Sequence, residues 1–398
     1  MNTNAAWLAE RLTLLGFDVP ELVTVDDHVG RIVEAVQRLA SRHRVVISTG
    51  GLGPTTDDLT AEAAAKALGV GVARHEPSIE AIRRRFQALG REMSLSNEKQ
   101  ANLPEGATVL PNALGTAPGF AITLGQARLF FLPGVPSEMR RMVEDQVEPA
   151  IASLAERTSC QIALRTFGLP ESVVGEKLAG IEQDEPAVTI GYRASFPEIE
   201  VKLLARAANQ AEAETIASRV ARVVRERLGS AVFGEGHDTF AAFVGHTLRD
   251  RGLTLAIAES CTGGMIGAMV TSVPGSSEYL LLDAVTYSNA AKHDLLGVDL
   301  ELMRHYGAVS EEVAAAMADG ARARADADIA VSVTGIAGPG GGTDAKPAGT
   351  VWFGLAQRGT PTTTRTVKLA GDRERIRTMA SYLALKMVAE AAVARGRG

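Results

Sequence analysis

Cysteine is scarce in this sequence, and its spacing fits no common cysteine-based site. Only Cys160 and Cys261 occur in 398 residues, which is too few for a disulfide framework, and no CxxC pair suggests a zinc site. This usage is typical of a reducing cytoplasm, where we expect the protein to reside. The chain also lacks a cationic apolar leader and any apolar run near the roughly 18 residues of a membrane helix. We therefore expect a soluble protein with no membrane partner.

Dense basic segments are also missing. The chain has 41 basic and 47 acidic residues, and its net charge is −6. Because a protein that neutralises phosphate backbones needs a basic track, this balance argues against nucleic acid as a partner. The 46% hydrophobic content supports large cores, and 398 residues exceed the length of roughly 250 to 300 at which a single core stops growing. We expect two or three domains.

The order of apolar and polar runs predicts an α/β protein with three units, at residues 1–152, 158–235 and 238–396. In the first and third units, short β-branched runs alternate with helical patterns, which is typical of a parallel sheet with helices on both faces. The middle unit is predicted to be α+β. In its segment "EIEVKLLARA" (198–207), apolar and largely polar positions alternate, which favours an open sheet with one polar face.

The first unit begins inside a helical pattern instead of a strand. Asn2 or Asn4 can cap this helix, and Leu8, Leu12 and Leu15 line one of its faces. Since folds of this kind usually open with a strand, we expect the first strand of the sheet to be absent from the sequence.

A candidate nucleophile lies in "AESCTGG" (258–264), directly after the apolar run 253–257. Ser260 is predicted to lie between a strand and a helix, where the amides of Thr262, Gly263 and Gly264 can bind an anion or a developing oxyanion. Lys292 is a candidate base, because it falls in the first turn of a helix that follows a strand ending at Tyr287. A desolvated lysine can take the serine proton, with a tyrosine hydroxyl as relay.

Two other interpretations of this stretch stay open. Cys261 and His293 could form a Cys–His pair, although His293 points about 100° away from Lys292 on the same helix. A cysteine after an apolar strand is more often a small buried hydrophobe. Alternatively, residues 260–264 are a plain turn with capping hydroxyls and Lys292 is a solvated helix residue.

A glycine-rich segment, "TGIAGPGGGT" (334–343), follows another buried-looking strand. Glycine lets a backbone approach a ligand closely and exposes amides to phosphate, and ligands gather at such strand ends in α/β folds. The candidate substrate-binding residues here are Thr334, Gly335, Gly338 and Gly340. Arg373, at the start of the last helix, gains nothing from the helix dipole and is a candidate for an anionic substrate group. The alternatives are a surface loop and a solvated arginine.

A second candidate site is "TGGLGPTTDD" (49–58) in the first unit, after the strand "VVIS". Gly50 and Gly51 could hold a phosphate, and Asp57 and Asp58 a divalent metal ion, with Glu138 of "LPGVPSEM" as a further acid. Alternatively, Asp57 and Asp58 cap the next helix.

These motifs carry a family resemblance over nearly the whole chain. "AESCTGG", "VTYSNAAKHDLLGV", "VTGIAGPGGGTDAKPAGTVW" and "GDRERIR" resemble the C-terminal domain of CinA-like, competence/damage-inducible proteins, a family that includes nicotinamide-nucleotide amidases. "TGGLGPTTDDLT", "GTAPGF" and "LPGVPSEM" resemble its three-layer, molybdopterin-binding-like domain, and the middle segment resembles its small KH-type unit.

The resemblance implies hydrolysis of the carboxamide of nicotinamide mononucleotide to nicotinate mononucleotide and ammonia, in pyridine nucleotide salvage. It makes Ser260 the nucleophile, Lys292 its base and Tyr287 the relay, and it places Thr334 with its glycine loop around the substrate and Arg373 near the anionic part. Amide hydrolysis through an acyl-serine needs no cofactor. The resemblance also implies a homodimer.

The resemblance implies two alternative functions as well. The first domain of the family is associated with divalent-metal-dependent cleavage of the ADP-ribose pyrophosphate. Its members normally begin with a strand and a "GTELLLGQ"-like loop, so we expect that domain to be impaired in the sequence as written. The KH-type unit could instead be a competence- or DNA-damage-linked adaptor, but it lacks an evident GXXG clamp loop and is not basic.

Overall fold

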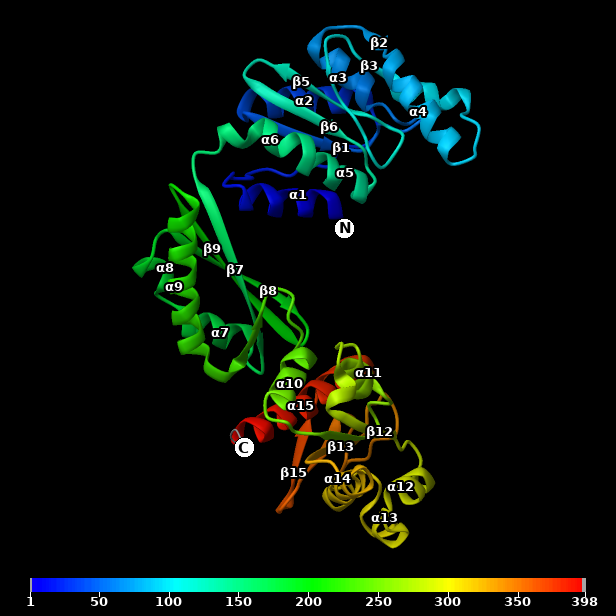
Figure 1. The fold of residues 1–398 in the computed structure, drawn as a ribbon, viewed down its shortest axis with the longest axis vertical. Coiled ribbons are helices and arrows are strands. Elements are labelled where there is room, and N and C mark those ends of the chain that lie inside the picture. The colour runs from blue at the N-terminus through cyan, green and yellow to red at the C-terminus, as the bar shows by residue number, and fades with distance from the viewer. Residues whose placement is uncertain (1, 396–398) are drawn as a thin grey trace. The chain divides into compact units, whose positions relative to one another are not determined.

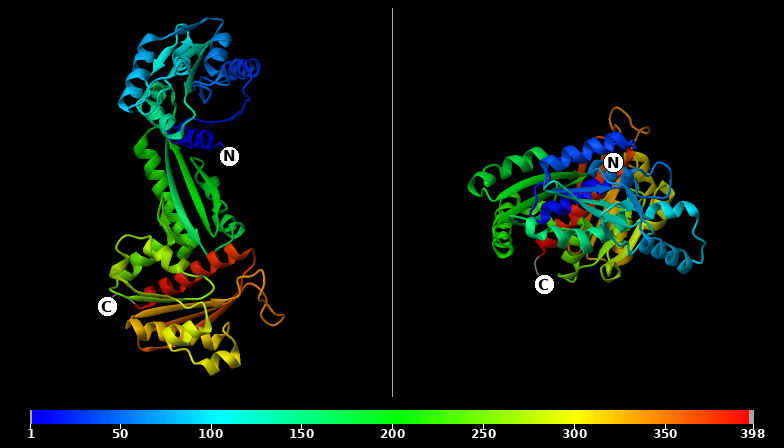
Figure 2. Two further views of the ribbon diagram at one scale, coloured as in Figure 1. Left: turned by 90° about the vertical axis from the view of Figure 1, so that its right-hand side faces the viewer. Right: turned by 90° about the horizontal axis from the view of Figure 1, so that it is seen from above.

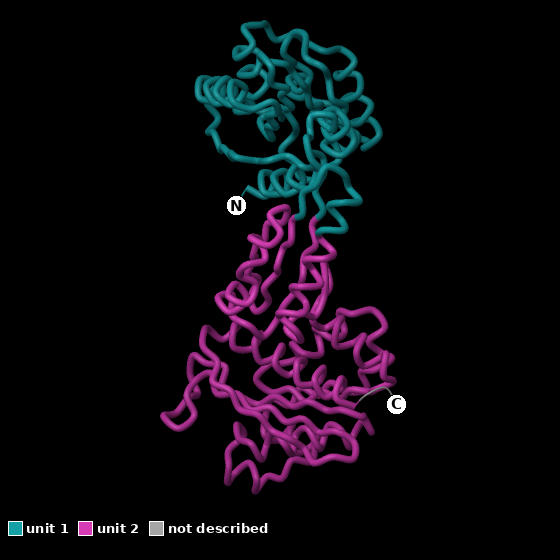
Figure 3. The backbone as a smooth tube through the Cα atoms, turned by 90° about the vertical axis from the view of Figure 1, so that its left-hand side faces the viewer, with its two compact units in different colours: residues 1–160, 205–216 teal, residues 161–204, 217–398 magenta. Residues whose placement is uncertain are grey.

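The structure is a computed structural model that describes residues 2–395. The chain divides into two compact units (Figure 3). The first consists of Met1–Cys160 with Ala205–Ile216, and the second of Gln161–Leu204 with Ala217–Gly398. The second unit therefore contains most of the middle segment together with the whole last domain. In the part of the chain that the structure describes, no helix is long and apolar enough to cross a membrane.

The first unit is built on a four-stranded mixed sheet (Figure 1). Its strands, in order across the sheet, are β1 (Val45–Thr49), β6 (Ala127–Leu132), β5 (Gly119–Leu124) and β4 (Thr108–Leu110). β1 and β6 are parallel, whereas β5 is antiparallel to both neighbours. The expectation of an all-parallel sheet is wrong here, because only residues 125–126 join β5 to β6 and so short a connection makes a hairpin.

Helices cover both faces of this sheet, as expected. They are α2 (Val29–Arg42) and α3 (Thr60–Leu68) on one face, and α1 (Thr3–Leu14), α5 (Pro136–Met142) and α6 (Glu148–Ile151) on the other. Away from the sheet, α4 (Glu76–Ala88) packs in a small separate cluster with Ala101, and a short hairpin pairs β2 (Val72–Arg74) with β3 (Asn102–Pro104). Neighbouring residues of β6 serve opposite faces: Phe131 packs in the core under α2 and α3, and Phe130 in the core with α1 and α5. Asn2 caps α1, as predicted, by accepting from the amide of Ala5.

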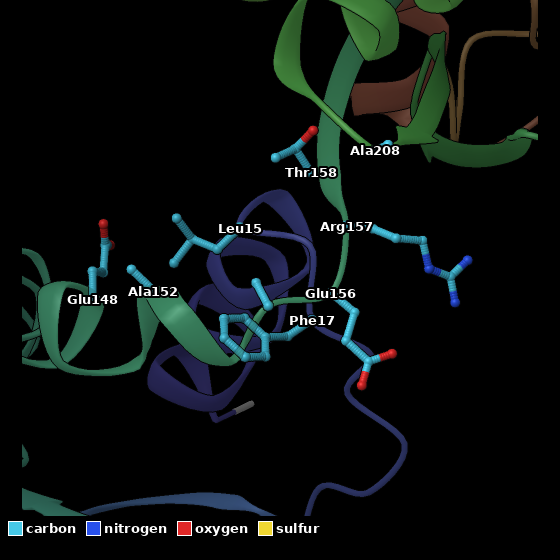
Figure 4. Close-up of a pocket in the computed structure, with 9 residues that line it drawn as sticks. Leu15, Phe17, Glu148, Ala152, Glu156, Arg157, Thr158 and Ala208 are labelled. Atoms are coloured by element: carbon cyan, nitrogen blue, oxygen red, sulfur yellow. The ribbon is translucent and has the colours of Figure 1, made fainter.

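An open cavity runs along β1, which is one of the two edge strands of the sheet. Its volume is about 630 Å³, and it lies between β1, α1, α2 and the segment 16–27. A smaller open cavity of about 190 Å³ is lined by Leu15, Phe17 and residues around Glu156 (Figure 4). That the first strand of the sheet is absent from the sequence stays a prediction.

The middle segment forms a four-stranded sheet with helices beside it. The strands, in order, are β10 (Val232–Glu235), β7 (Thr158–Phe167), β9 (Glu198–Ala207) and β8 (Val188–Ser195), and the helices are α7 (Glu171–Leu178), α8 (Ile181–Asp184) and α9 (Gln210–Leu228). The expected polar open face of β9 is not found at its start. Glu198 and Glu200 are only 4% and 8% exposed. Glu198 is buried because it accepts a hydrogen bond from Tyr382 of the last helix at 2.8 Å.

The last domain is a three-layer α/β structure (Figures 1 and 2). Its five strands, in order, are β12 (Leu280–Val285), β11 (Leu255–Glu259), β13 (Ile329–Gly335), β14 (Thr350–Gln357) and β15 (Thr360–Lys368). β11 is parallel to β12 and β13, β14 is antiparallel to β13, and β15 is antiparallel to β14. The helices are α10 (Phe240–Arg249), α11 (Met265–Thr271) and α15 (Arg373–Ala394) on one face, and α12 (Asn289–Leu296), α13 (Leu300–Tyr306) and α14 (Glu311–Ala325) on the other. The predicted α/β class and three-part architecture are confirmed.

Aromatic side chains join the middle segment to the last domain. Phe167 of β7 packs against Phe240 and Tyr382, with ring centroids 5.1 Å apart in both pairs. Phe233 of β10 meets Phe240 edge to face. These contacts belong to the same apolar core as α10 and α15.

Candidate active site

Ser260 lies where the most buried strand of the last domain ends. All five residues of β11 are buried, because the strand lies in the middle of a sheet whose two faces are both covered by helices. Residues 260–264 then turn into α11. Gly263 and Gly264 have φ values of +61° and +88°, which residues with a Cβ rarely adopt. The glycines predicted to line the site are thus needed to build the turn itself.

Lys292 is buried beside Ser260. Ser288 caps α12 by accepting from the amide of Ala291 at 3.0 Å, which places Lys292 in the first turn as predicted. The Lys292 side chain is inside the protein, with 1% of the residue exposed. Its Nζ lies 3.1 Å from the Ser260 Oγ and donates to the Thr286 carbonyl at 2.7 Å. Burial lowers the pKa of Lys292 from its ordinary value of 10.5.

Cys261 and His293 are not brought together. The Cys261 thiol points into the apolar core, and burial raises its pKa to about 12, so that almost none of it is a thiolate near neutral pH. His293 Nδ1 lies 2.9 Å from the carbonyl of Val298, which follows the end of its helix. The geometry therefore favours Ser260 over Cys261 as the nucleophile.

Arg373 ties two parts of the site together. It is the first residue of α15, whose N-terminus Asp372 caps, and its guanidinium donates to the Gly338 carbonyl at 2.9 Å and to the Tyr287 hydroxyl at 3.1 Å. Tyr287 is 63% exposed. The structure thus pairs the tyrosine predicted as a relay with Arg373, while Lys292 bonds to Ser260 and Thr286.

The glycine loop is held by side chains at both ends. The Thr334 hydroxyl is buried and donates to the Ala308 carbonyl at 2.7 Å. A Cβ at Gly335 would lie 2.9 Å from the Thr350 carbonyl oxygen, so glycine is needed there for close packing of β13 on β14. Gly340 faces open space. Lys346 donates to the Tyr306 and Val309 carbonyls, at 2.8 and 2.7 Å, and anchors the loop on α13.

The sequence interpretation missed two residues that shape the nucleophile turn. Arg377 of α15 donates twice to the Thr262 carbonyl, at 2.6 and 3.2 Å. Glu259 accepts the amide of Gly264 at 2.9 Å, so that this amide is turned inward. An acid between an apolar strand and a serine is the one signal in the sequence that could have drawn attention to Glu259.

The candidate residues of the first unit are mostly engaged with the protein itself. The Gly50 amide donates to Leu132, at the end of β6. Asp58 accepts from both the amide and the hydroxyl of Thr55, at 2.9 and 2.6 Å, and closes a turn. Glu138 accepts from the Asn112 amide group at 2.7 Å.

The remaining candidates of the first unit are Gly51, predicted to hold a phosphate, and Asp57, predicted to hold a metal ion. Gly51 has a φ of +67°, and Asp57 is exposed. The alternative that the two aspartates cap the next helix is wrong, since Leu59 occupies the N-cap of α3 and no side chain caps it. Among residues 2–395, no three His, Cys, Asp or Glu side chains are grouped closely enough to hold a metal ion.

Comparison with known proteins matches each of the three parts of the chain to a family model. Residues 1–153 match the probable molybdopterin binding domain, residues 161–234 the damage-inducible protein CinA KH domain, and residues 237–392 the CinA C-terminal domain. The CinA-like protein of Geobacter sulfurreducens is 46% identical over 389 residues, covering 97% of this chain and 94% of its own length. That of Geotalea uraniireducens is 44% identical over 387 residues, covering 97% and 92%.

Among solved structures, the competence/damage inducible protein CihA from Agrobacterium tumefaciens is 39% identical. The match covers 39% of this chain and 93% of that chain, with a TM-score of 0.38. The matches along the sequence, nearly end to end, establish that the chain belongs to the CinA-like, competence/damage-inducible protein family.

Proposed function

We propose that the last domain is an amidohydrolase that converts nicotinamide mononucleotide to nicotinate mononucleotide and ammonia through a Ser–Lys mechanism. The observation that carries this proposal is the buried Lys292 Nζ, 3.1 Å from the Ser260 Oγ. Burial disfavours the ammonium form, and a neutral amine within hydrogen-bond reach of a hydroxyl can act as its general base. The pair thus meets the geometric and electrostatic requirements for an activated serine.

In the first half of the reaction, the Ser260 Oγ attacks the carboxamide carbon while its proton passes to Lys292. The carbonyl oxygen becomes an oxyanion, which needs donors already in position. The backbone amides of Cys261 and Thr262 suit this role, because they donate to no backbone carbonyl within residues 2–395. Lys292 then returns the proton to the departing amine, which leaves as ammonia and gives an acyl-serine.

In the second half, a water molecule attacks the acyl-serine carbon while Lys292 accepts its proton. The collapse of this intermediate breaks the ester bond, Lys292 reprotonates the Ser260 Oγ, and the carboxylate product leaves. The net change is addition of water across one amide bond. Every proton transfer in this scheme uses Lys292, and no cofactor takes part.

The nucleotide part of the substrate is assigned to the glycine loop and to Arg373. A guanidinium binds phosphate through paired, charge-assisted hydrogen bonds, and Arg373 already lies between Gly338 and Tyr287. We infer that Gly338 and Gly340 line the phosphate side, while Thr334 and Gly335 hold the base of the loop. The contact with Arg373 supports a binding role for Tyr287, and a relay role requires its hydroxyl to turn toward Lys292.

An ammonia-release assay on nicotinamide mononucleotide tests the proposal, with and without a metal chelator. We expect chelator-insensitive release by the full chain and loss of release in Ser260→Ala. The matched control is Ser277→Ala, an exposed serine in a short 3-10 helix of the same domain. Full activity in Ser260→Ala would refute the assignment, and so would a wild-type protein that releases no ammonia.

A further inference from the structure

Glu259 lies behind the nucleophile turn, and the mechanism above gives it no role. It is the last residue of β11, and its exposed fraction is 0%. A carboxylate removed from water is strongly destabilised unless hydrogen bonds replace its hydration. Such a residue in the middle of an active domain therefore needs a structural reason.

The Glu259 carboxylate receives one amide on each oxygen. Oε2 accepts from Gly264 at 2.9 Å, and Oε1 accepts from Gly267 at 2.8 Å. Both amides belong to the start of α11, where no earlier turn supplies carbonyl acceptors. The positive end of the helix dipole also favours a negative charge at this point. The side chain therefore fastens the start of α11 to the end of the strand that precedes Ser260.

The main chain of Glu259 contacts the segment that carries the base. Its carbonyl accepts from the Thr286 amide at 2.7 Å, and the Thr286 carbonyl in turn accepts from Lys292. One residue thus touches both the element that follows the nucleophile and the segment that holds the base. A shift of Glu259 would alter the distance between Ser260 and Lys292.

Asp283 of β12 completes the surroundings of Glu259. A Cβ at Gly267 would lie only 1.8 Å from the Asp283 Oδ2, so this carboxyl group lies directly over the start of α11. Partial burial and the neighbouring Glu259 raise the pKa of Asp283 to about 7. Below that pH, Asp283 is protonated and can donate to the Glu259 carboxylate.

We propose that Glu259 is a positioning residue of the hydrolase: by binding the amides of Gly264 and Gly267 it turns them away from the substrate and holds Ser260 at the reactive distance from Lys292. The turn then presents the amides of Cys261 and Thr262 to the oxyanion. This inference takes its substrate from the proposed function. The reactivity of Ser260, which depends on its position, can be measured without that substrate.

The test is Glu259→Gln in the full chain. A glutamine side chain has one oxygen and one NH₂ group. Its oxygen can accept a hydrogen bond from only one of the two backbone amides, and its NH₂ group, which is a donor, would face the N–H of the other. We expect kcat to fall by about 10²-fold, as for a misplaced catalytic group, while KM changes less than about threefold. The control is Glu301→Gln, on an exposed side chain of α13, which should match the wild type. A KM rise that accounts for the whole loss would overturn the proposal.

A fluorophosphonate probe, which reacts with activated serines, separates this inference from the proposed function. We expect Ser260 to be labelled in the wild type and labelling to slow by about 10-fold or more in Glu259→Gln. If the wild type is labelled but releases no ammonia, the substrate assignment fails while the positioning role is still measured by the labelling rates. Equal labelling of wild type and Glu259→Gln refutes the positioning role.

Glu259→Asp serves as a second variant if Glu259→Gln does not fold. It keeps the charge, but its side chain is one methylene shorter and cannot reach both amides. We expect a labelling rate between those of the wild type and Ser260→Ala, on protein whose folded fraction is measured by circular dichroism. Wild-type labelling of folded Glu259→Asp contradicts the proposal.

Discussion

Replacing Lys292 by methionine removes the proposed base while keeping the buried shape. Methionine has a similar length and no charge, and the lysine it replaces is 1% exposed. A positioned general base contributes roughly 10²- to 10⁴-fold, which corresponds to about 2.7 to 5.5 kcal/mol of activation free energy. We therefore expect kcat of Lys292→Met to fall by that factor, while KM stays within about threefold.

The pH profile gives this prediction a second, independent signature. With its ordinary pKa of 10.5, a lysine is only about 0.3% neutral at about pH 8, and each unit by which burial lowers the pKa raises that fraction about tenfold. The wild-type kcat/KM should thus rise with pH through a value below 10.5. The residual activity of Lys292→Met should lack this rise.

Stability should change in the opposite direction to activity. The folded state lowers the pKa of Lys292, so the unfolded chain binds the proton more readily. The penalty for burying the lysine is fully present below its folded pKa, and it shrinks as pH rises through the folded pKa toward 10.5. Lys292→Met should therefore have a higher free energy of unfolding than the wild type, and the difference should be largest at low pH. Urea titrations of both proteins at two pH values would measure this difference.

The assay is ammonia release by folded wild-type and variant protein, from about pH 6 to about pH 10. The reasoning is refuted if Lys292→Met keeps more than about one tenth of the wild-type kcat. It is also refuted if the rise of kcat/KM with pH persists unchanged, because another group would then be the base.

Three further predictions concern other parts of the last domain. Cys261→Ala should retain most ammonia release, because burial raises the pKa of the thiol to about 12 and keeps it from acting as a nucleophile; activity lost without a drop in melting temperature would contradict this. Arg373→Ala should raise KM by about 10- to 100-fold, with a smaller effect on kcat, in steady-state kinetics. Arg373→Lys should restore only part of the affinity, because a lysine ammonium cannot reproduce the paired donors with which the guanidinium spans Gly338 and Tyr287. Gly320→Ala should lower the free energy of unfolding by about 1 to 3 kcal/mol, because the added Cβ would lie 2.0 Å from the Leu296 carbonyl oxygen. The control is Gly175→Ala, which has open space around it and should raise the free energy of unfolding by about 0.5 to 1 kcal/mol. Equal effects of the two substitutions in urea titrations would show that helix propensity outweighs packing.

Local sequence signals predicted the parts of the site that local structure builds. An apolar run followed by two glycines predicted the strand and turn around Ser260, and the serine cap before Lys292 predicted its place in the first helical turn. Whether that lysine is buried depends on packing between β11, α12 and their neighbours, which periodicity does not encode. The structure supplies that answer.

The residues that sequence reasoning missed act over long separations. Arg377 bonds to a carbonyl 115 residues earlier in the chain, and no pattern in "GDRERIR" distinguishes it from Arg373. Glu259 was passed over because an acidic residue usually indicates a solvated position. The pair of aspartates after the glycine loop of the first unit predicts metal binding, which stays a prediction, and the structure adds that Asp58 closes a turn by accepting from Thr55.

The aromatic contacts of Phe167 and Phe233 with α10 and α15 have an evolutionary consequence. Phe240 and Tyr382 are covered by the middle segment, and Tyr382 also donates to Glu198 there. A gene that encoded the last domain alone would expose this apolar surface and leave the tyrosine without its acceptor. Descendants of such a gene would be under selection to replace these aromatic residues with polar ones, whereas in the fused chain a substitution at Phe167 or Phe233 of the middle segment is also a substitution in the core of the last domain.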